Sequence, residues 1–182
     1  MKKLSLLVVL CFAALGVASA QSYTVNRYES KFGHIRRSTP IQYRGEAYVG
    51  YSVGIGDGAI DRFNVHTIHG VQIGDYFSTG LGTGVDIYFE DGETGTVIPV
   101  FLNLKGYLPL DRDITPYLSF DVGGGFGVGD AFSGLSGFMC APAVGVQWRM
   151  FQAQLGYTLQ QFSESGLSLN MGALQLKIGV NF

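Results

Sequence analysis

Cysteine is almost missing from this chain of 182 residues, which contains only Cys11 and Cys140. Cys11 lies in an N-terminal segment that we expect to be cleaved off, so one cysteine remains in the mature chain. A single thiol cannot form an intramolecular disulfide bond, even in an exported compartment that would permit one. Disulfide-stapled folds are therefore excluded.

Charge is scarce too, and basic charge in particular. Charged residues make up 14% of the chain, whereas a water-soluble surface usually carries about 25% or more. Without Lys2 and Lys3, ten basic side chains stand against fourteen acidic ones, which leaves a net charge near minus four. A chain with this balance is not expected to bind nucleic acid.

Long apolar runs are absent after residue 20, where no stretch approaches the ~18 uninterrupted apolar residues of a membrane-spanning helix. A helical membrane protein is therefore excluded. Apolar residues nevertheless reach 47%, with 27 glycines, 13 phenylalanines and 10 tyrosines. This composition suits β-structure that faces an apolar solvent.

The N-terminus has the pattern of a secretory signal peptide. Lys2 and Lys3 precede an apolar core from Leu4 to Val17, and residues 18–20 form a small Ala-Ser-Ala cleavage site. We therefore expect a signal peptide at 1–20 and a periplasmic lead at 21–42. The lead has no clear period, and the alternative is that it tucks into the mouth of the domain that follows.

From Tyr43 onward, apolar residues alternate with polar or small ones in eight runs of about ten to fifteen residues. A tilted strand needs about 9 to 11 residues to cross the hydrocarbon layer. Lipid offers no partner to an unpaired strand edge, so the sheet must close. The pattern predicts an all-β fold over 43–182, an eight-stranded antiparallel closed transmembrane β-barrel with its apolar face outward. His69 falls on the lipid side, which a local bulge would repair.

Short polar segments separate the runs and predict which end of the barrel is which. Tight turns are expected at Gly74-Asp75, Leu110 to Asp113 and Arg149-Met150. Short turns and both termini belong to the periplasmic end of such barrels, so the remaining connections face outward.

The inward face carries a balanced set of charges. Charges in a narrow lumen must be paired or solvated, so we predict a salt-bridge network that fills the lumen. A proton path or a ligand pocket is the alternative. The closing strands are expected to bring Glu46 close to Lys177. The predicted network comprises Arg44, Glu46, His66, Asp86, Glu90, Lys105, Asp121, Arg149 and Lys177.

Inward glycines recur at every second residue over 80–84 and 123–129, without the helix that a dinucleotide-binding loop would require. We interpret them as making room for Tyr48, Tyr88, Tyr107 and Tyr117, with a small cavity as the alternative. His66 and His69 face opposite sides of one strand, so they do not form a metal site. No hydrolase signature is visible, and we expect neither an enzyme nor a bound cofactor.

The outward connections are acidic, with Arg62 as their only basic residue. Asp57, Asp61, Asp91 and Glu93 could bind divalent cations that bridge to lipopolysaccharide phosphates. Simple solvation of the loop tips is the alternative.

Three segments resemble the outer-membrane β-barrel domain family of small OmpA/OmpX-like barrels in Gram-negative bacteria. They are Tyr43-Arg44-Gly45, His69-Gly70 and the run from Gly156 to Gln160. The resemblance covers 43–182 and implies an outer-membrane location and a closing strand whose terminal Phe182 is an assembly signal. The implied partners are outer-membrane lipid, lipopolysaccharide and the barrel-assembly machinery.

These features together lead us to expect a monomeric barrel with a structural or surface-interaction role. One alternative is a narrow pore or a small-ligand transport barrel. Another is a soluble lipocalin-like calyx, in which the aromatic side chains would line the inside around an apolar ligand.

Overall fold

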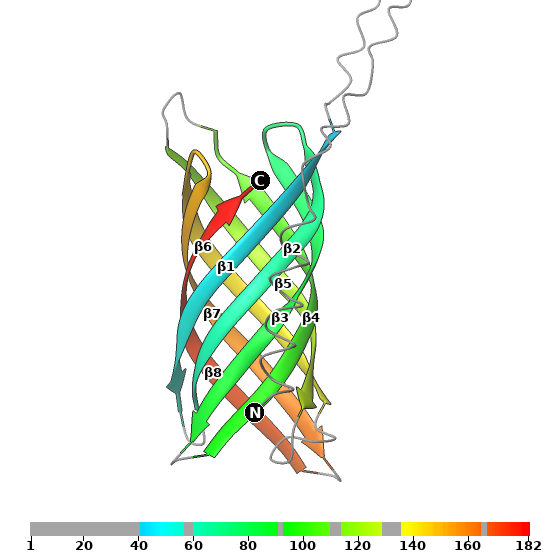
Figure 1. Cartoon of the computed structure of the whole chain (residues 1–182), viewed down its shortest axis with the longest axis vertical. Helices are drawn as coiled ribbons and strands as arrows, with labels where there is room; N and C mark the ends of the chain where they lie inside the picture. The colour runs from blue at the N-terminus through cyan, green and yellow to red at the C-terminus, as the bar shows by residue number, and fades with distance from the viewer. Residues whose placement is uncertain (1–40, 57–59, 91–92, 110–113, 129–135, 165–166) are drawn as a thin grey trace, which may run out of the picture.

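The computed structural model describes residues 41–56, 60–90, 93–109, 114–128, 136–164 and 167–182 (Figure 1). The expected signal peptide and most of the expected lead lie outside these residues. The described chain forms eight strands: β1 (Ile41–Ile55), β2 (Asp61–Ile73), β3 (Phe77–Glu90), β4 (Glu93–Tyr107), β5 (Ile114–Val128), β6 (Ser136–Trp148), β7 (Phe151–Glu164) and β8 (Leu167–Asn181).

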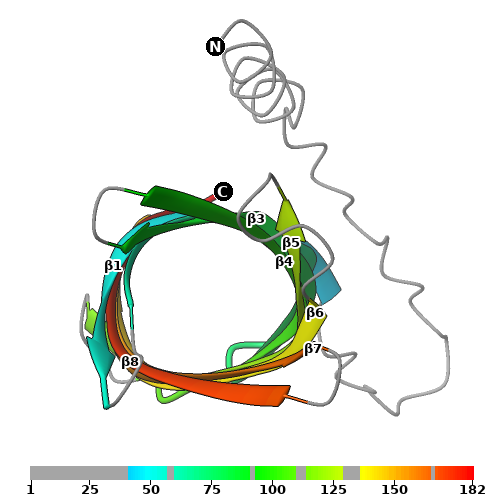
Figure 2. The same ribbon diagram turned by 90° about the horizontal axis from the view of Figure 1, so that it is seen from below.

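The strands form one closed antiparallel barrel, as the sequence predicted. Each strand pairs with the next along the chain, and β8 pairs with β1 from Ile55↔Gly172 to Glu46↔Asn181. The strands cross the molecule at a marked tilt in Figure 1 and form a complete ring in Figure 2. Closure leaves no sheet edge without a hydrogen-bonding partner.

Two ends of the barrel can be told apart. The start of β1 and the C-terminus lie at one end (Figure 1), which also carries the turns that follow β2 and β6. We call this the turn end, and the opposite end the loop end. The expected turns at Gly74-Asp75 and Arg149-Met150 are confirmed, with φ angles of 62° at Gly74 and 54° at Arg149. The expected turn at 110–113 lies outside the described residues.

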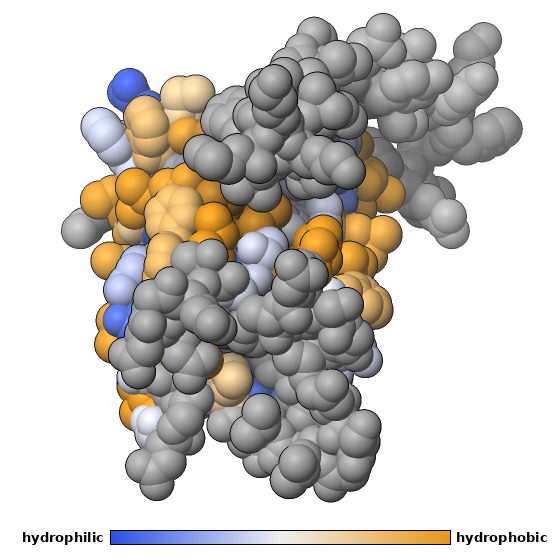
Figure 3. Space-filling view, turned by 60° about the horizontal axis from the view of Figure 1, so that its bottom comes forward, coloured by the Kyte–Doolittle hydropathy of each residue, from blue (hydrophilic) through white to orange (hydrophobic). Residues whose placement is uncertain are grey.

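The outer wall is apolar and the interior is polar, the inverse of a water-soluble protein. Leu81 is 66% exposed and Leu118 is 61% exposed, whereas Lys105 and Asp86 are each only 1% exposed. Figure 3 shows apolar side chains over much of the wall that the grey atoms leave visible. The large apolar side chains thus point outward, so the structure does not support the lipocalin-like calyx.

The barrel begins two residues before the expected Tyr43, because β1 starts at Ile41. β4 starts at Glu93, and its pairing with β3 continues to Glu90↔Glu93, although residues 93–96 lack a strong apolar alternation. Within the described ranges, we find no helix with the length and apolar character to span a membrane.

His69 does lie on the outer face, but without the expected bulge. The register between β1 and β2 runs without interruption from Ile41↔Ile73 to Ser52↔Arg62. His69 is accommodated because its ring nitrogens have partners: the Tyr43 hydroxyl lies 2.6 Å from Nδ1, and the Thr67 hydroxyl lies 3.1 Å from Nε2. The bulge prediction was therefore wrong.

Candidate functional site: a charged and hydrogen-bonded lumen

At the turn end of the lumen, the carboxylate of Glu46 holds two cations. Its Oε1 accepts a hydrogen bond of 2.6 Å from Nε of Arg44, and its Oε2 accepts one from Nζ of Lys105. Glu46 is only 2% exposed. Charge-assisted bonds to a buried carboxylate are about twice as strong as neutral ones.

Lys105 connects strands on different sides of the barrel. From β4, its Nζ reaches the Tyr48 hydroxyl on β1 at 2.5 Å and Oε1 of Gln152 on β7 at 3.2 Å. It also lies 5.0 Å from the ring centre of Tyr117. A single ammonium group therefore crosses the lumen and satisfies its three donors without water.

Arg44 extends the same cluster toward the turn end. Its Nη1 donates a hydrogen bond to Gln72 on β2, and its Nη2 donates one to Gln147 on β6, each with a length of 2.7 Å. The guanidinium also lies 5.0 Å from the ring centre of Tyr107. Together these bonds tie β1 to both of these strands across the mouth of the barrel.

Two further carboxylates lie deeper in the lumen. Asp86 accepts a hydrogen bond of 2.6 Å from Nδ2 of Asn64 and lies 2.7 Å from Nε2 of His66. Asp121 accepts a 2.5 Å bond from Nδ2 of Asn103 and lies 3.6 Å from Nζ of Lys177. Each buried carboxylate therefore has at least two polar partners, as burial of charge requires.

A third cluster, nearer the loop end, is centred on Arg62. Its Nη1 donates hydrogen bonds of 2.7 Å to the Tyr88 hydroxyl and to Oε1 of Gln160. The expectation that Arg62 lies among the outward connections is wrong, because the residue is 1% exposed inside the barrel. The period-two pattern of β2 contained the signal, since Arg62 shares a face with Asn64 and His66.

Glycines make space for the large lumen side chains. An added Cβ at Gly179 would overlap the ring of Tyr48, and one at Gly145 would overlap that of Tyr117. The interpretation of the inward glycines is therefore confirmed for these two tyrosines. It extends to Phe101, which occupies the space beside Gly82.

The expected network needs one correction. Arg149 is exposed, because β6 has ended at Trp148 and the turn directs its side chain outward, where the guanidinium lies 5.9 Å from the Trp148 ring centre. The other expected member that is not seen in the network is Glu90, whose side chain lies outside the described residues.

The expected pair of Glu46 with Lys177 is not formed. The register places Asn181 opposite Glu46, and Lys177 lies opposite Gly50. Lys177 therefore sits further from the turn end and contacts Asp121 instead. The stagger that closes a barrel separates residues that a simple count from the strand ends would bring together.

Of the expected cation rim, the side chain of Asp61 alone is described. It accepts 2.9 Å hydrogen bonds from the Tyr51 hydroxyl and from the backbone N–H of Gly54, which ties β1 to β2. Asp57, Asp91 and the side chain of Glu93 lie outside the described residues. Among the residues that are described, no group of three potential metal ligands occurs.

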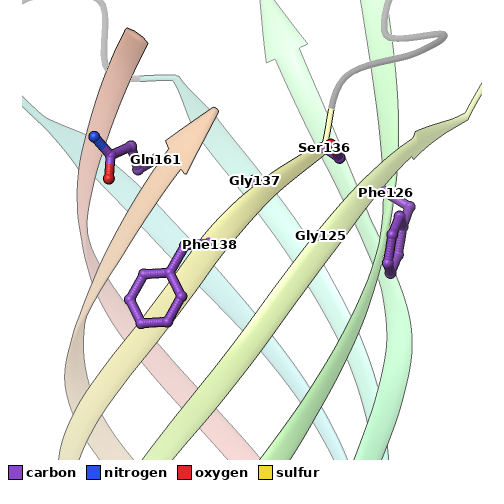
Figure 4. Close-up of a pocket in the computed structure, with 6 residues that line it drawn as sticks. All are labelled: Gly125, Phe126, Ser136, Gly137, Phe138 and Gln161. Atoms are coloured by element: carbon purple, nitrogen blue, oxygen red, sulfur yellow. The ribbon is translucent and has the colours of Figure 1, made fainter. Parts of the chain in front are cut away.

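A hollow of about 450 Å³ lies in the wall near the loop end. Figure 4 shows the rings of Phe126 on β5 and Phe138 on β6 on either side of Gly125 and Gly137 in that view. Ser136 and Gln161 complete the described lining, which carries no charged side chain. The described lining of the hollow thus differs from the charged lumen in its chemistry.

No known family model matches the chain, and no curated protein matches it in sequence. Solved structures do match. The N-terminal β-barrel domain of Pseudomonas aeruginosa OprF shares 15% identity and a TM-score of 0.50, over 76% of this chain and 97% of that one. Neisserial surface protein A shares 12% identity and a TM-score of 0.56, over 78% and 95%. The outer membrane enzyme PagL shares 11% identity and a TM-score of 0.51, over 74% and 98%.

These similarities establish a shared fold. The chain is built as an eight-stranded barrel of the kind found in outer-membrane proteins, so the resemblance inferred from the sequence is confirmed at this level. The fold does not decide the role, because these neighbours include an enzyme.

Proposed function

We propose that this chain is an integral outer-membrane protein with a structural or surface-interaction role and a lumen closed by its own side chains. The observation that carries the proposal is the bond network across the interior. Lys105 joins β4 to β1 and β7, and Arg62 joins β2 to β3 and β7. A lumen crossed at two levels in this way leaves little room for a continuous water path.

The outward apolar belt supports the membrane part of the proposal. Exposed Leu176 and Ile178 on β8 continue the row of apolar side chains that Val49 and Tyr51 begin on β1. In water, a contiguous surface of this kind would drive aggregation, whereas in a bilayer it is the expected contact with lipid. We infer that the turn end faces the periplasm and that outer-membrane lipid and lipopolysaccharide surround the barrel.

The proposal includes a monomeric, non-enzymatic barrel that the barrel-assembly machinery inserts. In a closed barrel the backbone groups of every strand are paired with a neighbouring strand, so a second copy is not needed for stability. The bonded charges of the lumen serve in this proposal as a rigid polar core rather than as acid and base catalysts.

Cell fractionation tests the location. We expect the mature protein in the outer-membrane fraction, resistant to carbonate and urea extraction. Recovery of a folded, detergent-free soluble monomer would contradict the membrane role.

Planar bilayer recording tests the closed lumen. We expect no steady conductance from the wild-type barrel. Reproducible single-channel steps that change size in Lys105→Met or Arg62→Gln would contradict a closed lumen and favour a narrow pore.

A small-ligand or transport role is the second candidate, and the hollow between Phe126 and Phe138 is the observation that favours it. Its described lining would suit an apolar molecule. Binding of a brominated hydrocarbon in the hollow can be followed by quenching of tryptophan fluorescence. Trp148 lies too far from the hollow to report it, so we suggest a Phe138→Trp variant. Saturable quenching in that variant, with none in Leu81→Trp, would support this second candidate.

A further inference from the structure

Arg62 differs from the other cations of the lumen because it contacts no carboxylate among the described residues. Its side chain is 1% exposed and projects from the second residue of β2, near the loop end. The other three lumen cations each lie within 4 Å of a carboxylate. An uncompensated guanidinium inside a protein is far more costly than a paired one.

The free side of the Arg62 guanidinium is the one suited to an anion. Both of its hydrogen bonds leave from Nη1, toward Tyr88 and Gln160. Within the described chain, Nε is buried without an acceptor. Nε and Nη2 form the fork with which arginine holds anions through two parallel bonds.

Two neutral donors belong to the same region. Nε2 of Gln160 and Oγ1 of Thr158 are buried with no hydrogen-bond partner in the part of the chain that is described. The two residues are adjacent inward positions on β7, and Oε1 of Gln160 already holds Arg62. Across the lumen, a Cβ at Gly125 would lie 2.6 Å from Nε2 of Gln160, so the glycine makes room for this amide.

The charge balance of the described lumen points the same way. Its cations exceed its carboxylates by one, when His66 is counted as neutral. The cations are Arg44, Arg62, Lys105 and Lys177, and the carboxylates are Glu46, Asp86 and Asp121. Asp86 interacts electrostatically with Arg62, so the excess belongs to the described lumen as a whole. Water could satisfy the unpartnered donors, but it adds no charge.

We propose that the loop-end part of the lumen binds one small monovalent anion of halide size. The Nε and Nη2 edge of Arg62 supplies the charge, and Nε2 of Gln160 and Oγ1 of Thr158 supply neutral donors. The anion completes the bonded layer that Arg62, Tyr88 and Gln160 build across the barrel. This site requires only that the lumen is as described and does not depend on the role proposed above.

Bromide is a suitable probe because it is halide-sized and scatters X-rays anomalously. The folded barrel in detergent is unfolded with urea in sodium bromide or in sodium gluconate at equal ionic strength, since gluconate is too large for the site. A ligand that binds the folded state raises the midpoint in proportion to the logarithm of its concentration above Kd. We expect the wild-type midpoint to stay constant at low bromide and to rise with the logarithm of the bromide concentration above Kd.

Three variants separate the site from a general salt effect. Arg62→Gln should abolish the rise, and Arg149→Gln, which removes an exposed arginine outside the lumen, should preserve it. Thr158→Val deletes one unpartnered hydroxyl at nearly constant volume and should raise the bromide concentration at which the midpoint begins to rise at least about threefold. Thr158→Val serves alone if Arg62→Gln does not fold.

Diffraction from crystals grown with bromide gives the direct test. We expect an anomalous peak within hydrogen-bonding distance of Nε of Arg62. Equal midpoints in the two salts, a bromide response that survives in both lumen variants, or ordered water alone beside Nε would each overturn the proposal.

Discussion

The C-terminal residue Phe182 lies directly against Gly45, the third residue after the expected lead. The two residues exchange both backbone hydrogen bonds, at 2.8 and 2.9 Å, and an added Cβ at Gly45 would overlap the Phe182 ring. The ring also lies 6.5 Å from that of His69, which stacks on Tyr43. Two of the three segments that carried the family resemblance, Tyr43-Arg44-Gly45 and His69-Gly70, thus meet on the outer wall beside the C-terminal Phe182.

The first prediction concerns this contact. Gly45→Ala should lower the free energy of unfolding by about 1 to 3 kcal/mol, because the new methyl group and the Phe182 ring compete for one space. Gly106→Ala is the matched control, since Gly106 is exposed near the same end and an added Cβ there would contact nothing within 4 Å. Urea unfolding of both variants in lipid vesicles measures the difference. Equal losses of unfolding free energy in the two variants would show that the contact of Phe182 with Gly45 does not stabilise the barrel.

The second prediction concerns assembly. Deleting Phe182 should reduce the yield of folded barrel in the membrane, because it removes both backbone bonds to Gly45 and the ring that covers it. Phe63→Ala removes an exposed aromatic from the outer wall near the loop end and should leave the yield nearly unchanged. Heat-modifiable mobility on gels, applied to membrane fractions, quantifies folded protein. Wild-type yields from the truncated chain would refute this role of Phe182.

The third prediction tests how His69 is tolerated on the outer wall. Tyr43→Phe removes the hydroxyl that lies 2.6 Å from Nδ1 of His69 and should cost about 0.5 to 1.5 kcal/mol. The cost should largely vanish in a His69→Leu background, where the hydroxyl has lost its partner. A double-mutant cycle measured by unfolding gives the coupling. Tyr76→Phe, at an exposed turn, serves as the control and should be nearly neutral.

The fourth prediction concerns the partner of Glu46. Glu46→Gln should cost about 3 to 5 kcal/mol, because it leaves the buried Lys105 without its carboxylate. Adding Lys105→Met should recover much of that loss. Adding Lys177→Met instead should give an additive loss, because Lys177 contacts Asp121 and not Glu46. Recovery with Lys177→Met rather than with Lys105→Met would restore the pairing that the sequence suggested and refute the register.

Residues of one strand were predictable because their environment depends on local geometry. Successive side chains of a strand point to opposite faces, so the alternation around Leu176 and Lys177 was enough to place one on the outer wall and the other in the lumen. The same rule holds at His69, which lies outward as its position requires. The bulge was an unnecessary repair, since the partners that satisfy His69 come from neighbouring residues that the alternation could not identify.

The sequence itself therefore determined the closed barrel, its number of strands and which face is apolar. Periodicity and the lack of long apolar runs can be read from single segments of the chain, without knowledge of how the segments pair. Tertiary structure decided which charges meet. Barrel closure staggers the strands, so Glu46 pairs with Lys105 on β4 and not with Lys177 on the adjacent strand β8. It also decided where the strands end, which turned Arg149 outward and brought Arg62 inside. Contacts across a lumen depend on the register of the whole sheet, and no single segment contains that information.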